Sequence, residues 1–367
     1  MAAMTDGGVS IVRPELDEKP WGGRELENYG LTLPADARIG EALVTANSVR
    51  VSTGAGRGRT LGELVADDPG TALGPVAGSA VGGRPLFPML VKLIDAQENL
   101  SIQVHPDDAM AAVFDRLGKT EAWHVLSAKP GSFLYAGLQG GVSSETLVTT
   151  AARMNGSSAD LLRRIPAKPG ATILLPAGTV HALGAGVVVY EIQQPSDITY
   201  RLDDWGRVGP DGAPREMHQD AGVAAMRAEL RPELIPPVAL PANEGRRHLL
   251  AMCAKFALER IALPGGGRCP VETLDGPQVV TVIGGAARLG ERLLTVGQSA
   301  VVWPGAVDLT LEATAPIVVL RGWVPDIGVE FERIASLPGV DPNALGLLSG
   351  SLPDMRETLD AHGRTSV

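Results

Sequence analysis

Short apolar runs separated by glycine and proline are the feature that most limits how this chain can fold. The 367 residues include 45 glycines and 28 prolines, which leave few stretches long enough for an uninterrupted helix. The apolar runs have strand length and are partly β-branched, which favours an all-β sandwich or barrel over alternating strands and helices. We predict strands at 88–94, 100–104, 123–126, 132–135, 172–175, 187–192, 279–283, 299–303 and 317–320.

Fewer segments carry a helical pattern, and one proline-rich segment divides the chain. The tail after Pro325 is compatible with helix, and further helices are predicted at 60–66, 107–117, 144–165 and 215–230. The segment 231–243 contains four prolines and no helical period, which is typical of a semi-rigid linker. The domains we expect are a first domain over 1–230, a linker over 231–247, a second β-rich domain over 248–325 and a partly helical tail over 326–367.

Charge and cysteine content exclude several classes of partner. The formal net charge is −10, so the surface as a whole repels polyanions and nucleic acid is not an expected partner. Cys253 and Cys269 cannot build a disulfide framework, which fits a reducing compartment. The opening residues MAAMTDGG lack the basic and apolar parts of a secretory signal. We therefore expect a cytoplasmic protein that acts on a small molecule.

One uncharged stretch, residues 170–190, has the length of a membrane span. Pro176 and Gly178 interrupt it, and His181 lies in its middle. Its apolar runs are short and partly β-branched, so they read as two buried strands joined by a turn. We expect no membrane partner.

Two segments pair possible metal ligands at a spacing of two residues. Gln103 and His105 fall on the same face of a predicted strand, where both can reach a single cation. Lys119 and Glu121 also share a face if their segment is extended, and Glu121 is suited to complete a metal shell. Lys119 beside it is a charge partner, a proton carrier or a group that binds an anionic substrate. Alternatively, Lys119 and Glu121 form an ordinary surface ion pair.

The stretch from Gly170 to His181 has the spacing G, five residues, P, x, G, two residues, H. It resembles the second motif of the cupin family, in which the histidine is a metal ligand. The first cupin motif is altered, because its usual H-x-H reads Gln103-x-His105 here and the glutamate lies downstream at Glu121. Asp107 and Asp108, which follow, are better explained as helix-start residues than as ligands.

The altered pattern resembles that of the type I mannose-6-phosphate isomerases, in their shorter bacterial branch. The similarity covers roughly residues 10 to 225 and consists of several motifs in the right order. These motifs are WGG from Trp21, IGE from Ile39, FPMLVKLIDAQENLSIQVHPDD from Phe87, LGKTEAW from Leu117, LLPAGTVHAL from Leu174 and YEIQQPSDITYRLDDWGR from Tyr190.

The resemblance implies a mainly β bicupin, with two jelly-roll barrels and a few connecting helices. It further implies a zinc-dependent enzyme that interconverts mannose 6-phosphate and fructose 6-phosphate through a cis-enediolate, as a monomer or small homo-oligomer. The implied zinc ligands are Gln103, His105, Glu121 and His181, the implied catalytic residues are Arg201 and Lys119, and the implied contacts to the sugar phosphate are Lys92 and Ser101.

Several points stay open in the sequence. Longer family members carry a histidine immediately before the lysine that matches Lys119, and here that position is Gly118. The proton carrier is therefore Lys119, Glu191, Asp197 or a metal-bound water. Arg201 has an alternative role as the buried partner of Asp203 or Asp204. The alternative functions are an isomerase of another sugar or sugar phosphate and a sugar-binding cupin without catalysis.

The second β-rich part lacks the residues for a similar site. No histidine occurs from Leu249 to Ala361, although the turn from Gly297 to Asp308 loosely parallels the one that ends at His181. We therefore expect a structural role for this part.

Overall fold

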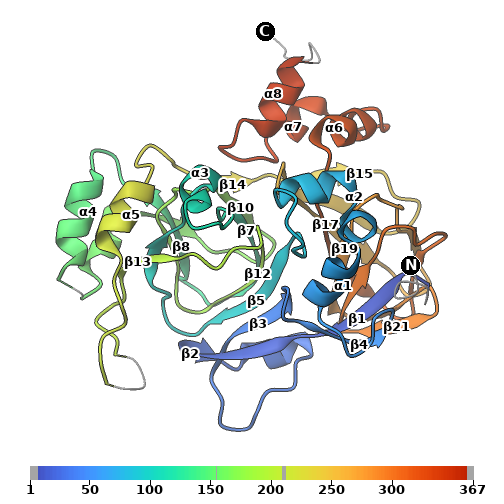
Figure 1. Cartoon of the computed structure of the whole chain (residues 1–367), viewed down its shortest axis with the longest axis horizontal. Helices are drawn as coiled ribbons and strands as arrows, with labels where there is room; N and C mark the ends of the chain where they lie inside the picture. Colours follow the sequence, from blue (N-terminus) through green and yellow to red (C-terminus); the bar gives the residue numbers. More distant parts are fainter. Residues whose placement is uncertain (1–6, 154, 209–211, 362–367) are drawn as a thin grey trace.

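The computed structural model describes residues 7–153, 155–208 and 212–361, which form two β-barrels side by side (Figure 1). The fold is mainly β with few helices, as the sequence predicts. Four antiparallel sheets of eight, seven, five and four strands make up the two barrels.

The first barrel pairs the seven-stranded with the five-stranded sheet. In spatial order, the seven strands are β14 (Leu234–Ile235), β10 (Thr172–Leu175), β7 (Glu121–Ala128), β12 (Val187–Gln193), β5 (Leu90–Ala96), β3 (Ile39–Thr45) and β2 (Glu15–Gly23). The five strands are β13 (Tyr200–Asp203), β6 (Ile102–Val104), β11 (His181–Leu183), β8 (Phe133–Leu138) and β9 (Leu162–Pro166). Alternate residues of both sheets point inward and bury an apolar interior that includes Trp21, Trp123 and Leu183.

The second barrel pairs the eight-stranded with the four-stranded sheet. The eight strands are β15 (Val238–Leu240), β16 (Arg246–Cys253), β17 (Phe256–Leu263), β24 (Ile317–Trp323), β19 (Gln278–Gly284), β22 (Ser299–Val302), β1 (Val9–Arg13) and β4 (Arg50–Gly54). The four strands are β18 (Arg268–Pro270), β23 (Thr310–Ala313), β20 (Ala286–Leu289) and β21 (Arg292–Thr295). The largest apolar core lies where the outer faces of the two large sheets meet, with Ile192 of one sheet and Leu258 of the other among its buried residues.

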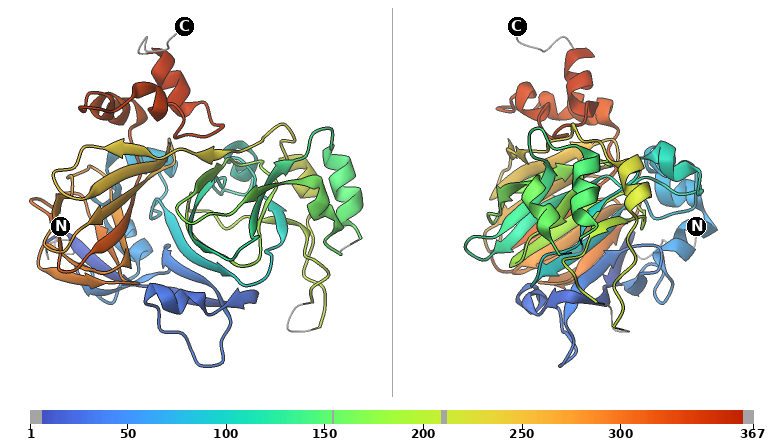
Figure 2. Two further views of the ribbon diagram at one scale, coloured as in Figure 1. Left: turned by 180° about the vertical axis from the view of Figure 1, so that it is seen from behind. Right: turned by 90° about the vertical axis from the view of Figure 1, so that its left-hand side faces the viewer.

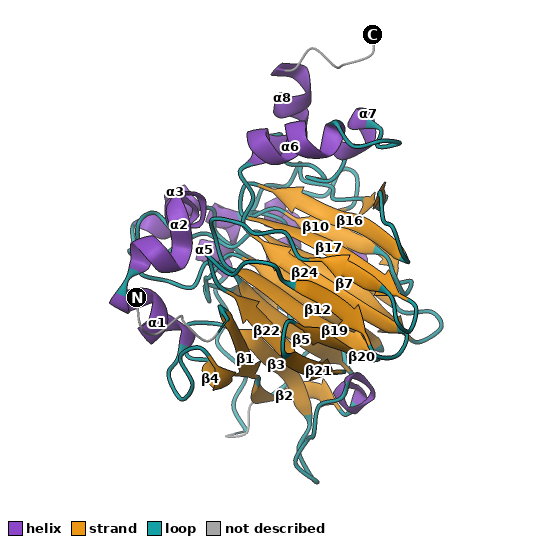
Figure 3. Ribbon diagram, turned by 90° about the vertical axis from the view of Figure 1, so that its right-hand side faces the viewer, coloured by secondary structure: helices purple, strands orange, loops and turns teal. Residues whose placement is uncertain are grey.

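Helices cover the ends and the outer faces of the barrels (Figures 1 and 2). Leu147 and Ala225 attach two of them to the outside of the five-stranded sheet. The last three form a separate layer at one edge of the large sheets (Figure 3). The helices are α1 (Leu61–Asp67), α2 (Pro69–Ala80), α3 (Asp108–Ala112), α4 (Ser144–Ala151), α5 (Gln219–Ala225), α6 (Ile327–Ala335), α7 (Pro342–Leu345) and α8 (Asp354–Ala361), with 3-10 turns η2 (Glu25–Tyr29) and η3 (Ser157–Leu161).

Three predicted helices are shorter than the sequence pattern indicates. The helix predicted over 144–165 ends at Ala151, because Gly156 turns the chain with a positive φ of 77° and residues from Leu162 then join the sheet as β9. The helices predicted over 107–117 and 215–230 shrink to α3 and α5. In the first of these, strand pairing and a glycine turn outweigh the local helical period.

The proline-rich segment is not a free linker. Its residues form β14, which pairs with β10 of the first barrel, and β15, which pairs with β16 of the second. The sheets also cross the predicted boundary, because β1 and β4 belong to the second barrel. The division of the chain into the four predicted domains stays a prediction.

No helix among the described residues is long and apolar enough to cross a membrane. The uncharged stretch 170–190 instead contributes β10, β11 and the start of β12 to the first barrel.

Candidate active site in the first barrel

Three neighbouring strands of the five-stranded sheet bring site residues into one row. Gln103 of β6 lies directly opposite His181 of β11 on one side and Arg201 of β13 on the other. His105 follows Gln103 by two residues and so extends the same face beyond the end of β6. Residues that are 78 and 98 positions from Gln103 along the chain are thereby neighbours.

The opposite sheet supplies a carboxylate to this row. Glu121 is the first residue of β7 and faces inward, as does Trp123, while Ala122 between them packs in the core between the barrels. The Trp123 ring meets the edge of the His181 imidazole, with ring centroids 5.4 Å apart. The alternation of β7 therefore aims Glu121 across the barrel interior.

His105, Glu121 and His181 form a compact buried group. The Nε2 atoms lie 3.6 Å (His105) and 3.2 Å (His181) from the Glu121 carboxylate, and the three ligand atoms lie within 4.8 Å of one another. Each side chain is only 1–2% exposed. Two imidazoles and a carboxylate are a ligand set that suits zinc in an open, catalytic arrangement.

Hydrogen bonds on the far side of each ring aim both Nε2 atoms at the carboxylate. Nδ1 of His105 lies 2.9 Å from the carbonyl oxygen of Ile198, and Nδ1 of His181 lies 2.9 Å from that of Thr179. Because a carbonyl only accepts, each Nδ1 carries the proton and each Nε2 presents a lone pair in the neutral ring. Burial lowers the pKa of both imidazoles, to about 4 for His181, which favours this neutral form.

Three of the four polar atoms that converge here lack a hydrogen-bond partner among the described residues. Among the described residues, His105 Nε2 and both carboxylate oxygens of Glu121 are buried without one. Buried polar atoms are costly unless they are paired or bound to a metal. The residues present therefore fit a divalent cation.

Gln103 can supply a fourth ligand atom. Its Nε2 lies 3.3 Å from His181 Nε2, and its Oε1 lies 3.4 Å from the Ser101 hydroxyl. A half-turn of the amide would point Oε1 toward the cation and let Nε2 donate to Ser101. Ser101 thus contacts the amide that it would orient.

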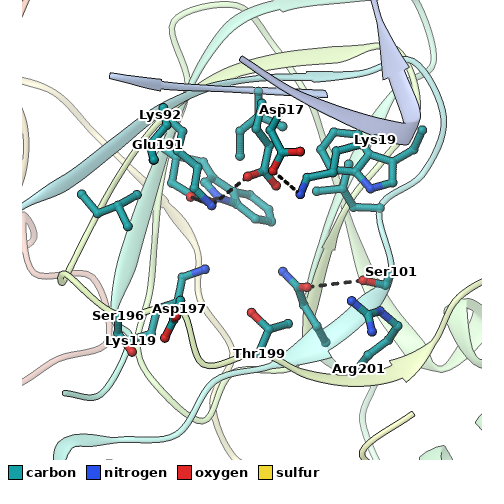
Figure 4. A pocket seen from close by; sticks show the side chains of 18 of the residues that line it. Asp17, Lys19, Lys92, Ser101, Lys119, Glu191, Ser196, Asp197, Thr199 and Arg201 are labelled. Atoms are coloured by element: carbon teal, nitrogen blue, oxygen red, sulfur yellow. Dashed lines mark hydrogen bonds and ion pairs between the residues drawn. The ribbon is translucent and has the colours of Figure 1, made fainter. Parts of the chain in front are cut away.

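The group lies beside a cavity of about 610 Å³ in the barrel mouth (Figure 4). The side chains labelled in Figure 4 surround an open space, with Lys92, Glu191 and the β2 residues Asp17 and Lys19 on one side and Lys119, Asp197 and Arg201 on the other. The other five predicted site residues, Lys92, Ser101, Gln103, Lys119 and Arg201, line this cavity. Its charged and polar lining comprises Glu15, Asp17, Lys19, Glu41, Lys92, Ser101, Gln103, Lys119, Glu191, Ser196, Asp197, Thr199, Arg201 and Arg215.

Lys92 sits between two carboxylates on the wall formed by the seven-stranded sheet. Its Nζ lies 3.1 Å from Glu41 and 3.6 Å from Glu191. Burial alone would lower the pKa of Lys92, but the two carboxylates outweigh it and raise that pKa. Burial and the nearby Glu121 charge raise the pKa of Glu191, whose Oε2 accepts a hydrogen bond of 2.8 Å from the Trp123 indole.

Lys119 is part of the same buried site and not of a surface ion pair. Its Nζ lies 3.1 Å from Glu121 Oε2, and the side chains are 6% and 1% exposed. The neighbouring Asp107 and Asp108 are helix-start residues, as the sequence predicts, because Asp107 caps α3 by accepting a hydrogen bond from Met110.

Arg201 is not the partner of the nearby aspartates. Asp204 binds Arg207 and Arg215, and Asp203 accepts a hydrogen bond from Ser158. Arg201 donates to the Glu216 carbonyl at 2.9 Å, and in the described part of the chain no carboxylate forms an ion pair with it. Burial and the neighbouring Arg215 lower its pKa. Its guanidinium, half-buried beside Gln103, keeps donors to spare.

Comparison with known proteins places these features in a family. Residues 11–123 match the model of the type I phosphomannose isomerase catalytic domain. Mannose-6-phosphate isomerase ManA of Bacillus subtilis is 36% identical over 228 residues, which are 60% of this chain and 69% of that protein. Mannose-6-phosphate isomerase of Streptococcus mutans is 34% identical over 218 residues, 58% of this chain and 66% of that protein.

Solved structures agree with the sequence comparison. The crystal structure of the mannose 6-phosphate isomerase from Bacillus subtilis has a TM-score of 0.76 at 28% identity, over 86% of this chain and all of that one. A zinc-bound mannose 6-phosphate isomerase has a TM-score of 0.66 at 17% identity, over 86% of this chain and 99% of that one, and shares the fold. This chain belongs to the type I mannose-6-phosphate isomerase family.

This type I isomerase departs from longer family members at Gly118, and the structure gives the reason. A Cβ atom at Gly118 would lie 2.5 Å from the backbone nitrogen of Asp108 and 2.6 Å from the carbonyl carbon of Asp107. The start of α3 therefore fills the space that a side chain would need. A histidine at this position would require α3 to move.

Sequence reasoning missed part of the cavity wall of this isomerase. Lys19 and Asp17 of β2 pair at 2.6 Å over the cavity, and Glu41 of β3 binds Lys92. Arg215, which also lines the cavity, lies beyond the last matched motif. The segment ELDEK of β2 is mostly charged and does not alternate between apolar and charged residues, so its pattern gave no sign of a place in the cavity wall.

Proposed function

We propose that this chain interconverts mannose 6-phosphate and fructose 6-phosphate, with a zinc ion held by Gln103, His105, Glu121 and His181. The observation that carries the proposal is the convergence of two imidazole nitrogens and a carboxylate within 4.8 Å, next to a cavity of about 610 Å³. That volume is in the range of small-molecule sites and is ample for a hexose phosphate. The names of its relatives support the same substrate.

A bound zinc ion would supply Lewis acidity, stabilising negative charge on the sugar oxygens as a proton moves between C1 and C2. The chain's own residues do the remaining work. Arg201 reaches the row of ligands from β13 and offers a permanently charged, planar donor to an anionic oxygen. The backbone carbonyls of Ile198 and Thr179, which lie beside the two Nδ1 atoms, hold the imidazoles in the ligating tautomer.

Three side chains that line the cavity are able to carry the proton. Lys119 is tied to the Glu121 carboxylate. Glu191 is buried, has a raised pKa and keeps Oε1 without a hydrogen-bond partner. Asp197 is largely exposed and accepts from Arg116 at 2.6 Å. Gly118 offers no side chain, so the histidine of longer relatives has no counterpart at that position.

Solvent exchange distinguishes these three groups. The variants Lys119→Met, Glu191→Gln and Asp197→Asn are compared in heavy water, with deuterium incorporation at C2 followed by NMR. The variant that removes the base should lose exchange and net turnover together. A variant that keeps exchange while it loses turnover acts in another step, such as ring opening or product release.

Lys92 and Ser101 are proposed to face the sugar phosphate. Lys92 keeps its positive charge between Glu41 and Glu191, and its ammonium group lines the cavity. Ser101 lines the wall on the side of the five-stranded sheet, next to Gln103. Both can reach a substrate oxygen without displacing a metal ligand.

A coupled assay for fructose 6-phosphate tests the function as a whole. Zinc-loaded protein should convert mannose 6-phosphate, chelator-treated protein should not, and zinc should restore the rate. Full activity in metal-free protein would contradict a metal-dependent mechanism. A panel of other aldose phosphates and free sugars decides the substrate, since a higher kcat/KM on one of these would replace mannose 6-phosphate as the assignment.

The site of action proposed here is the cytoplasm, with the chain as a monomer or small homo-oligomer and no nucleic-acid partner. The two cysteines support a reducing compartment, because both are buried and free. Size-exclusion chromatography with light scattering gives the oligomeric state.

A further inference from the structure

A second cavity, of about 480 Å³, lies between the two barrels and combines a mainly apolar wall with a few polar side chains. It is bounded by β7 of the first barrel and by β16, β17, β19 and β24 of the second, where their outer faces diverge from the shared core. Its lining residues are Tyr29, His124, Val125, Leu126, Pro169, Gly170, Pro237, His248, Leu250, Arg260, Ile283 and Val318.

This cavity is separate from the active site. Successive residues of β7 point to opposite faces, so Trp123 borders the active-site cavity while His124 faces the space between the barrels. The β7 backbone therefore lies between the two cavities. Nothing in the proposed isomerase mechanism uses His124, His248 or Arg260.

The polar groups of this cavity are cationic or neutral. Arg260 of β17 and His248 of β16 are directly opposite each other in the sheet, and His124 lines the other side. No carboxylate is among the lining residues. In the described part of the chain, the side chains of Arg260 and His248 form no hydrogen bond or ion pair with another residue.

The pKa shifts of these side chains reflect the same excess of positive charge in the cavity. Burial and the neighbouring Arg260 lower the pKa of His124, and burial with Arg260 and Arg246 lowers that of His248. Burial and Arg246 also lower the pKa of Arg260. In a protein of net charge −10, an uncompensated guanidinium that is half-buried between two imidazoles is a local exception.

We propose that this cavity is a binding site for a small organic phosphate. A guanidinium binds phosphate oxygens through paired, charge-assisted hydrogen bonds, and the imidazoles of His248 and His124 can add further donors. Apolar side chains such as Leu126, Ile283 and Val318 form the rest of the wall and fit the carbon part of the ligand. The site goes beyond the proposed isomerase activity and does not depend on it.

Crystallography of the unmodified zinc-loaded protein tests this directly. Crystals soaked in tungstate, a heavy analogue of phosphate, should show an anomalous peak within hydrogen-bond distance of Arg260 and His248. Peaks confined to the active-site cavity would overturn the proposal. The tungstate experiment uses the unmodified protein, so its result remains valid even if substitutions at the interface impair folding.

Calorimetry with phenyl phosphate tests the class of ligand. The wild type should bind at the interbarrel cavity, and Arg260→Gln with His248→Gln should weaken that binding by about tenfold or more. Arg288→Gln removes the same charge from an exposed position on β20 and should leave binding unchanged. Arg201→Gln alters the active-site cavity and not the interbarrel cavity, so any phenyl phosphate binding that this variant weakens is assigned to the active site.

Equal affinities in the wild type and the double variant would overturn the proposal. Inorganic phosphate serves as the second probe, because binding of it alone, without phenyl phosphate, would overturn the assignment of an organic ligand. The turnover of the double variant with mannose 6-phosphate verifies that the fold is intact.

Discussion

The two barrels both bury charged side chains, but they treat them in opposite ways. In the first barrel, His105 Nε2 and the Glu121 carboxylate oxygens are buried without hydrogen-bond partners. In the second, Glu259 accepts from Arg247 at 2.6 Å and from Arg321 at 3.1 Å, and Arg321 Nε also donates to Gln278. The buried carboxylate of the second barrel accepts hydrogen bonds from two arginines. Glu121, whose Oε2 lies 3.1 Å from Lys119 Nζ, instead faces two imidazole Nε2 atoms, and this grouping marks a place where a cation belongs.

The corresponding turns of the two barrels differ in the same way. Gly178 follows Pro176 after one intervening residue, and Gly305 follows Pro304 directly. Both glycines have a positive φ, 89° for Gly178 and 82° for Gly305. Three residues later, the first turn places buried His181 in the site, and the second places exposed Asp308 on the surface. The glycine conformations are thus similar, but His181 begins strand β11, whereas Asp308 has a positive φ of 54° and lies outside the strands.

Matched substitutions in these two turns should give the largest contrast. We expect His181→Asn to lose the bound metal and essentially all turnover, because it removes one of the converging ligand atoms. Asp308→Asn tolerates the positive φ and should keep both. Mass spectrometry of metal content and the coupled assay measure the two effects. A metal-loaded, active His181→Asn variant would contradict the assignment of the site.

The buried pair of the second barrel should matter for stability and not for chemistry. Replacing Arg321 with methionine removes a cationic partner of the buried Glu259, which keeps Arg247, and takes the donor from Gln278 Oε1; we expect this to lower the free energy of unfolding by about 3 kcal/mol. The double variant with Glu259→Met should recover part of this loss. Urea unfolding measures both. A change in kcat of folded protein, without a loss of stability, would break the comparison.

Arg201 should affect turnover and leave stability nearly unchanged. We expect Arg201→Gln to lower kcat about a hundredfold, equivalent to about 3 kcal/mol, since it removes a fixed donor beside the metal ligands. Arg164→Gln, an exposed change on β9 of the same barrel, is the matched control. Near-normal kinetics of the Arg201 variant would remove this residue from the mechanism.

Lys92 should give the smallest effect of the four. We expect Lys92→Met to raise KM for mannose 6-phosphate about tenfold, because it takes a cation from the cavity and leaves the neighbouring Glu41 carboxylate to repel the phosphate. Steady-state kinetics over a range of substrate concentrations measures this. If KM does not change, the phosphate group lies elsewhere in the cavity.

The metal group was predicted in two ways: local spacing put Gln103 and His105 on one strand face, and the resemblance to family motifs implied Glu121 and His181 as the further ligands. Gln103 and His105 are two residues apart on one strand, and His181 follows a turn whose residues dictate its shape. The fold class was readable for a similar reason, since glycine and proline restrict run lengths throughout the chain.

The cavity wall, the packing around Gly118 and the ends of the helices depend on contacts between distant segments, which no local pattern encodes. The pairing of Glu41 with Lys92 requires β3 and β5 to be neighbours, and the packing of Gly118 requires α3 to start against it. The helix predicted over 144–165 begins as predicted but ends early for the same reason, because β8 pairs with the strand that begins at Leu162. Tertiary pairing overrides local propensity in such places.

The pairing of β1 with β22 also sets an order of events during synthesis. Val9 and Val302 are partners, and Trp303 Nε1 donates to the Ser10 hydroxyl at 2.8 Å. At ribosomal speeds, β22 is synthesised roughly 15 to 60 s after β1, so β1 lacks this partner strand during that time. Meanwhile β2, β3 and β5 can assemble nearby, so the catalytic half is expected to reach its shape with an apolar strand still exposed. That interval is when a chaperone would be needed most.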